Sequence, residues 1–122
     1  MTSDLSAALR AAAHGLDPDE AASGLIISHE AFLHRDDFTR YIRTTASISD
    51  GTPMAWVDWD AAITAPGSRG ISVSSAERRI LRIAVSLASG HPVSLRDAIP
   101  GLDQRSLHLA VTAIRRAAGQ RR

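Results

Sequence analysis

The chain of 122 residues contains no cysteine, no lysine and no asparagine. Without cysteine there is no disulfide framework, no cysteine nucleophile and no thiolate metal site. All 14 basic residues are arginine, and because the codons of lysine and asparagine are A-rich, this composition indicates a GC-rich genome. Arginine abundance is therefore weak support for a nucleic-acid ligand, and the net charge of +1 by itself favours no class of partner.

Long apolar runs and a targeting signal are also missing. No apolar run approaches the length that spans a bilayer, and the first ten residues, MTSDLSAALR, lack the basic start and apolar centre of a secretory signal. We therefore expect no membrane partner and a cytoplasmic location. With 44% hydrophobic and 22% charged residues, the composition is that of a globular protein long enough for one domain, 1-122.

Two helices are predicted in the N-terminal part, residues 1-64. The first covers about Asp4–His14 and ends at Gly15, a residue suited to the left-handed C-terminal stop. The second covers about Pro18–Leu33, because Asp17 can cap it and Glu20 can reach back to complete a capping box.

A short β-hairpin is predicted around residues 42-58. Apolar residues alternate with polar ones from Ile42 to Ile48, and Asp50 with Gly51 is a favoured turn pair before a return strand at Met54–Val57. A short helix beginning at Phe38 fits part of the same stretch and remains the alternative. Asp58 is then expected to cap one helical turn that reaches Ile63, and residues 65-74 read as a linker.

The helical C-terminal part, residues 75-118, has the clearest pattern. Ser74 and Glu77 form a capping box for a helix that runs to Ser89, and its apolar residues cover so much of its circumference that we expect it to be central. A short helix at Leu95–Ile99 follows, then a Pro-Gly turn, and then a last helix that Asp103 caps and that runs to about Ala118. The expected fold is a small, mainly α domain of about five helices with one short hairpin.

The last predicted helix divides into two faces. One face is apolar and is expected to turn inward, with Leu107, Ala110, Val111, Ile114, Ala117 and Ala118. The opposite face is polar and suits contacts to base edges and phosphates, with Gln104, Arg105, His108, Thr112, Arg115 and Arg116.

The segment RILRIAVSLASGHPVSLRDAIPGLDQRSLHLAVTAIRRAAG resembles the helix-turn-helix core of bacterial winged-helix regulators. It has a buried helix, a short helix after a Val-Ser pair, and a longer helix that ends in Ala-Ala-Gly. The resemblance implies that the last helix is a recognition helix. Gln104, Arg105 and His108 would then face bases, while Arg115 and Arg116 would approach the backbone.

The stretch SHEAFLHRDD, residues 28–37, is rich in potential metal ligands. His29 and His34 are five residues apart, so on one helix their side chains diverge by about 140° and cannot share an ion. His29 lies within the apolar stripe, where a core histidine with a hydrogen-bond partner is the plainer interpretation. Glu30 and His34 are spaced as an ordinary helix surface pair. We predict no metal ligand, no catalytic residue and no cofactor here or elsewhere.

The segments FLHRDDF, SISDGTPMAWVDW and SSAERRILRIAVSLASG resemble short uncharacterised actinobacterial proteins, which implies no activity. The leading hypothesis is a non-enzymatic protein-interaction module, with a protein partner or a second copy of the chain. Leu109 is an interface candidate because it lies on the otherwise polar side of the last helix. Met54, Trp56 and Trp59 are a second candidate patch, since aromatic and Met side chains are enriched at interfaces, and burial in the core is the alternative for them. DNA binding through the last helix is the second hypothesis. A metal-assisted hydrolase around His29 is the third, and no small-molecule substrate is evident.

Overall fold

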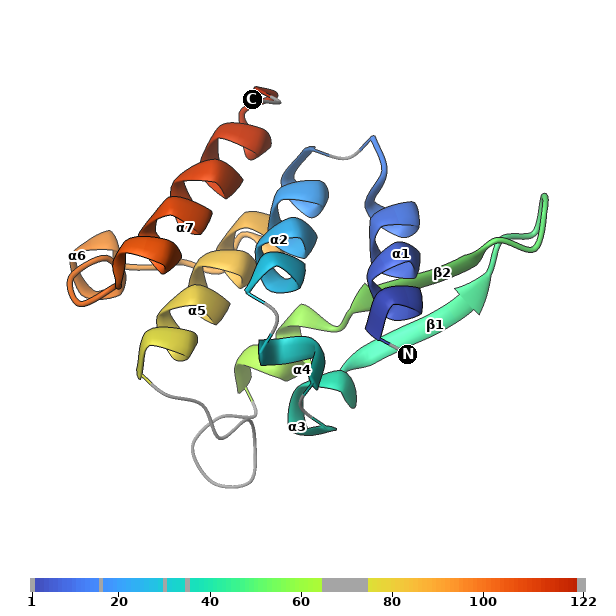
Figure 1. The fold of residues 1–122 in the computed structure, drawn as a ribbon, viewed down its shortest axis with the longest axis horizontal. Coiled ribbons are helices and arrows are strands. Elements are labelled where there is room, and N and C mark those ends of the chain that lie inside the picture. The colour runs from blue at the N-terminus through green and yellow to red at the C-terminus, as the bar shows by residue number, and fades with distance from the viewer. Residues whose placement is uncertain (1, 16, 30, 35, 65–74, 121–122) are drawn as a thin grey trace.

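The fold is mainly helical with one two-stranded antiparallel hairpin, which confirms the predicted class (Figure 1). The computed structural model describes residues 2–15, 17–29, 31–34, 36–64 and 75–120. In chain order the elements are α1 (Thr2–Ala13), α2 (Asp17–Ser28), the 3-10 helix η1 (Ala31–His34), α3 (Asp36–Thr39), β1 (Ile42–Ala46), β2 (Pro53–Val57), α4 (Trp59–Thr64), α5 (Ser75–Ser89), α6 (Leu95–Ala98) and α7 (Gln104–Ala117). None of the helices within those ranges is long and apolar enough to cross a bilayer.

Helix α2 begins at Asp17, one residue before the predicted start, and ends well before the predicted end. Gly15 adopts a φ of 85° between α1 and α2, and its N–H donates to the Glu20 carboxylate over 2.7 Å. The helix ends at Ser28 and not at Leu33, and a 3-10 turn follows. This break lets Phe32 pack against Phe38, with their ring centroids 5.1 Å apart and both side chains fully buried. A tertiary contact has therefore overridden the local helical pattern.

Helix α5 is the central helix, as its wide apolar surface predicted. Its buried side chains are Ile80, Leu81, Ile83, Ala84 and Val85, and it packs against α2, α4, α6 and α7. The helix ends at Ser89 and is followed by Gly90, which has a φ of 78°. One core cluster joins buried residues from both the N-terminal and the C-terminal part of the chain. The predicted cap at Ser74 and the predicted linker lie outside the described residues.

The hairpin is formed as predicted, and the alternative helix is confined to the preceding α3. Its register pairs Ile42 with Val57 and Ala46 with Pro53. Residues 47–52 join the strands; within them the Ser47 N–H donates to the Thr52 carbonyl over 2.8 Å, and Gly51 has a φ of 72°. Ala55 and Val57 are buried and β2 packs against α1, whereas the far end of the hairpin extends away from the helices (Figure 1).

Polar contacts fix the chain after the hairpin. The Asp58 carboxylate accepts from the Ala61 N–H over 3.2 Å, which confirms it as the cap of α4, and it also forms an ion pair with Arg43 at 3.5 Å. His91, in the segment before α6, lies 2.5 Å from the carboxylate of Asp60. This contact ties α4 to a segment 31 residues farther along the chain.

Candidate functional site

Helix α7 buries a different side from the one predicted. Its N-cap is Asp103, which accepts from the Ser106 N–H over 2.8 Å. The buried residues of the helix are Ser106, Ala110 and Ala113, and it packs against α2 and α5. Because these side chains are small, the helix can approach its neighbours closely.

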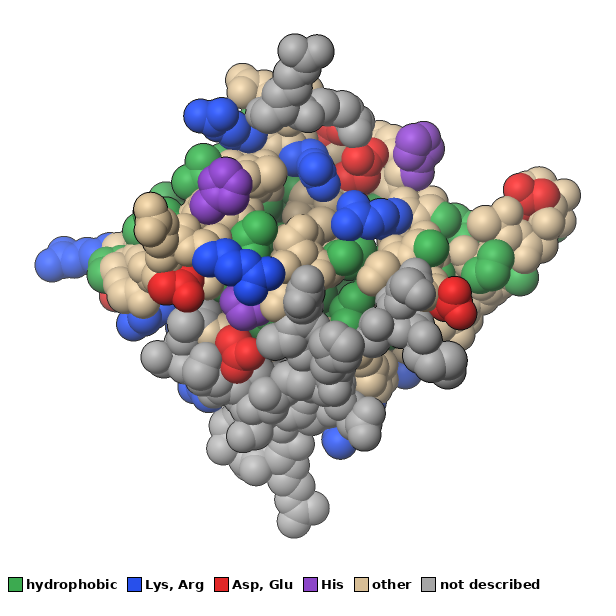
Figure 2. All heavy atoms as spheres, viewed as in Figure 1, with side chains coloured by type: hydrophobic (Ala, Val, Ile, Leu, Met, Phe, Trp, Pro, Cys, Tyr) green, Lys and Arg blue, Asp and Glu red, His purple; other side chains and the backbone are tan. Residues whose placement is uncertain are grey.

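The predicted inward face of α7 is therefore wrong for its large residues. Leu107, Val111 and Ile114 are 41%, 41% and 46% exposed, and they follow one another at intervals of four and three residues. We call these three residues the apolar stripe. Hydrophobic side chains appear at the upper left of the surface in Figure 2, over the region where α7 lies in Figure 1. Among the described residues, none fully covers these three large aliphatic side chains.

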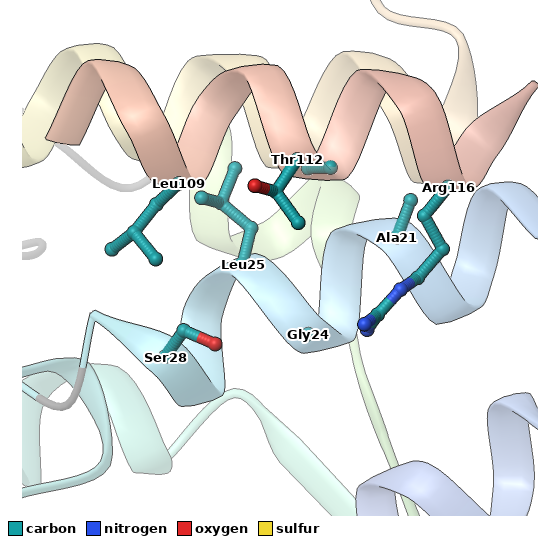
Figure 3. A pocket seen from close by; sticks show the side chains of 8 residues that line it. Ala21, Gly24, Leu25, Ser28, Leu109, Thr112 and Arg116 are labelled. Atoms are coloured by element: carbon teal, nitrogen blue, oxygen red, sulfur yellow. The ribbon is translucent and has the colours of Figure 1, made fainter. Parts of the chain in front are cut away.

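Leu109 is not the exposed residue that its polar neighbours suggested. It is half-buried and packs against the core, where it lines a small hollow of about 30 Å3 between α7 and α2 (Figure 3). Thr112 and Arg116 line the same hollow, so this side of α7 faces α2. A space of this volume has room for about one water molecule, which makes it a packing defect and not a ligand site.

The residues proposed for DNA contact separate into two groups. Arg105 donates from Nη2 to the carbonyl oxygen of Ser28 at 3.0 Å, and Arg116 lies against the backbone of α2 at Gly24. Together with Thr112, these arginines border the contact between α7 and α2. Gln104, His108 and Arg115 are exposed at one edge of the helix, and we call them the polar flank. The polar flank lies next to the apolar stripe, whereas Arg105 and Thr112 are exposed on the side of α7 that faces α2.

Arg105 and Arg116 have a structural task that the sequence did not reveal. A cation at the last carbonyl groups of a helix satisfies unpaired acceptors and opposes the negative end of the helix dipole, as Arg105 does at the end of α2. Gly24 lies within α2, where a glycine lowers the stability of a helix. In the structure its missing side chain leaves the space that the Arg116 guanidinium occupies. The role of Gly24 becomes clear only because α2 and α7 are neighbours in the fold.

His29 lies just after the last residue of α2, half-buried beside Phe32 at a centroid distance of 5.5 Å. Its Nδ1 atom is buried and has no hydrogen-bond partner, so the partner expected for a core histidine is not found at this nitrogen among the described residues. No group of three or more histidines and carboxylates in the described ranges can hold a metal ion. The predicted surface pair of Glu30 and His34 lies outside the side chains that the structure describes.

Both tryptophans of the chain border a second, larger hollow. Its volume is about 190 Å3, and α1, α2, β2 and the start of α4 surround it. Trp56 is 47% exposed, whereas Trp59 is half-buried and packs against the core. Met54 is half-buried on β2 and does not line the hollow. We call this space the tryptophan hollow; its other lining residues include Asp19, Ser23, Leu9 and Ala13.

Comparison with known proteins adds no assignment. No protein-family model matches the chain, and searches of curated proteins and of solved structures return no match. The two surface features that bear on function are the apolar stripe of α7 and the tryptophan hollow.

Proposed function

We propose that this protein is a non-enzymatic interaction module that associates with a second copy of itself through the apolar stripe of α7. The observation that carries the proposal is the exposure of Leu107, Val111 and Ile114 on one side of the helix. Large aliphatic side chains that expose more than two fifths of their surface in one row are typical of a protein contact.

The spacing of the stripe favours a helical partner of the same kind. Intervals of four and three residues are those of the core positions in a coiled coil, where each side chain inserts between side chains of a facing helix. A stripe with this spacing is complementary to another copy of itself, which is the requirement of a two-fold symmetric dimer. Ala118, four residues after Ile114, extends the row with a side chain small enough for close approach.

The surroundings of the stripe also suit a dimer contact. The polar flank of Gln104, His108 and Arg115 lies along one edge and can remain hydrated when the stripe is covered. A polar rim beside an apolar centre is the usual composition of a protein interface. Since α7 has 14 residues, the contact is about 21 Å long, and we expect reversible association and not an obligate dimer.

The test is sedimentation velocity over about a hundredfold range of protein concentration, comparing wild type with Val111→Glu. Wild type should shift from monomer to dimer, and the variant should need at least about tenfold more protein, because dimerisation would bury its carboxylate. Thr112→Glu is the matched control, since it places the same charge at the next position, on the side of α7 that faces α2. A wild type that stays monomeric throughout, or equal weakening by both variants, overturns the proposal.

A second candidate function is DNA binding, which the position of the polar flank favours. Gln104, His108 and Arg115 are exposed on a helix that follows a short helix and a turn, as on a recognition helix. Binding of duplex DNA should then fall steeply with salt and should weaken in Arg115→Ala. Arg116→Ala should weaken it less, because Arg116 lies against Gly24 of α2. Absence of binding at low salt would remove this candidate.

A further inference from the structure

We propose that strand β1 pairs with β1 of a second copy of the chain, so that two hairpins join into one four-stranded antiparallel sheet. The strand order of this sheet is β2-β1-β1-β2, with a two-fold axis at Thr44. The observation that carries the proposal is the open backbone edge of β1. This surface differs from the apolar stripe, and the pairing does not depend on association through α7.

The backbone of β1 has hydrogen-bonding groups that point away from the hairpin. The Ser47 N–H donates to the Thr52 carbonyl, so the backbone at position 47 faces the other strand. Because these groups alternate in direction along an antiparallel strand, the N–H and C=O groups of Thr44 and Ala46 point away from β2. No backbone hydrogen bond between described residues reaches Thr44 or Ala46 from outside the hairpin. These groups are therefore open to a further strand.

The outer edge of β1 is also accessible. Residues 43–46 are all exposed, and β2 is the described element that packs against this strand. The far end of the hairpin extends beyond the helices (Figure 1). The other strand is less suited to pairing, because Pro53 lacks an N–H, and Ala55 and Val57 are buried where β2 packs against α1.

Features that usually protect an exposed edge are missing from β1. Many proteins block such edges with lysine, proline, a bulge or a charge that points inward. The strand has no proline, its register with β2 runs from Ile42 to Ala46 without a bulge, and its one charged residue is Arg43. The guanidinium of Arg43 forms an ion pair with Asp58, the residue after β2, at 3.5 Å. This charge is therefore balanced within the chain and does not repel a second copy.

The sequence of β1 is complementary to itself in the antiparallel direction, which identifies a second copy as the partner. Centred on Thr44, the two strands overlap over all five residues, and Thr44 lies opposite Thr44 of the second copy. Arg43 then lies opposite Thr45, and Ile42 lies opposite Ala46, so no like charges face each other. Threonine pairs across antiparallel strands are favourable. One two-fold contact occupies the open edges of both copies, so the sheet closes at four strands.

Disulfide trapping tests this pairing, because the chain has no cysteine and one introduced cysteine reports on one position. In the proposed register the two Cα atoms at residue 44 lie about 5.5 Å apart, a separation that a disulfide spans. Under mild oxidation, Thr44→Cys should give at least about tenfold more linked dimer than Ser49→Cys. Ser49 is exposed in the turn, and the turns of the two copies point in opposite directions. Equal yields, or no linked dimer from Thr44→Cys, overturn the proposal.

Both cysteine variants also carry Val111→Glu, which separates this contact from the one through α7. A pair of five-residue strands buries little surface, so we expect the β1 contact to be weak and reversible. Trapping by a disulfide detects such a contact without requiring a stable dimer. Failure of the α7 dimer leaves the expected yields unchanged, and failure of the β1 contact leaves the sedimentation of wild type through α7 unchanged.

A charge swap tests the register and the identity of the partner, again with Val111→Glu present. Thr44→Lys and Thr44→Glu should each weaken association, because like charges then lie directly opposite each other at the two-fold axis. By sedimentation velocity, an equimolar mixture of the two should associate about fivefold more tightly than either variant alone. The same substitutions at Ser49, which is in the turn, are the control and should give no gain. A mixture at residue 44 that associates no better than its components contradicts the pairing.

Discussion

The guanidinium of Arg116 on α7 occupies the space above Gly24 on α2, where a Cβ atom at residue 24 would lie 2.8 Å from Nη1 (Figure 3). This contact explains why a glycine is tolerated at this position of α2, where the residues on both sides of Gly24 are buried. It also removes one arginine from the free surface that the sequence had suggested for nucleic acid.

Gly24→Ala tests this relationship through the stability of the fold. Alanine raises helix stability by about 1 kcal/mol relative to glycine, but the new methyl group must displace the end of the Arg116 side chain. The gain in unfolding free energy should therefore be smaller in wild type than in an Arg116→Ala background. Urea unfolding of the four proteins measures the coupling, and equal gains in both backgrounds would show that the two residues do not interact.

Leu107 and Leu109 give a direct test of which side of α7 is buried. Leu109→Ala should lower the unfolding free energy by about 2 kcal/mol, because Leu109 packs against the core. Leu107→Ala should change it by less than about 0.5 kcal/mol at concentrations where the chain is monomeric, since Leu107 is 41% exposed. A larger loss of unfolding free energy in Leu107→Ala than in Leu109→Ala would mean that Leu107 is on the buried side of α7, as the sequence predicted.

Gly101 lies in the turn before α7 at a φ of 89°. Gly101→Ala should destabilise the protein by about 1–2 kcal/mol, because a residue with a Cβ atom is strained in the left-handed region. The methyl group would also lie 2.5 Å from Nη1 of Arg79. The same substitution in an Arg79→Ala background removes that clash, and thermal unfolding should still show most of the loss if backbone strain dominates.

Asp103 makes the stability of α7 depend on pH. Hydrogen bonds from Ser106, with smaller contributions from the charges of His29 and Arg105, hold the pKa of Asp103 below its usual value of 3.8. A carboxylate whose pKa is lower in the folded state stabilises the fold above its unfolded pKa, and this contribution disappears as the pH falls through the folded pKa. The thermal midpoint of wild type should therefore fall more steeply below about pH 4 than that of Asp103→Asn. Asparagine caps a helix without titrating, so identical pH profiles would contradict this role.

Local signals predicted most of the fold because they act within a few residues. The positive φ angles of Gly15, Gly51 and Gly90 occur where turns and helix ends were expected. Asp58 and Asp103 cap the helices assigned to them, and the alternation of Ile42 with its polar neighbours predicted the hairpin. Each of these signals depends on backbone conformation and on hydrogen bonds between near neighbours, which the order of residues specifies directly.

The sites were less predictable because they depend on distant segments. Trp56 and Trp59 were predicted as interface candidates, but Asp19 was not, since only the packing of α1 and α2 against the hairpin brings it to the same hollow. The end of α2 was misplaced for a related reason. The chain leaves the α2 helix before Phe32, which then packs against Phe38. The residues next to Phe32 in the sequence do not show how favourable this contact is.

By itself, the sequence determined which segments form most of the helices and strands and which helix is central, because capping, turn geometry and apolar periodicity are local properties of a chain. Only the tertiary structure decided which side of α7 is covered. An amphipathic pattern shows which residues prefer burial, but the small side chains of Ser106, Ala110 and Ala113 permitted the closest packing against α2 and α5. The side of α7 with small residues is therefore the buried side, and Leu107, Val111 and Ile114 remain at the surface.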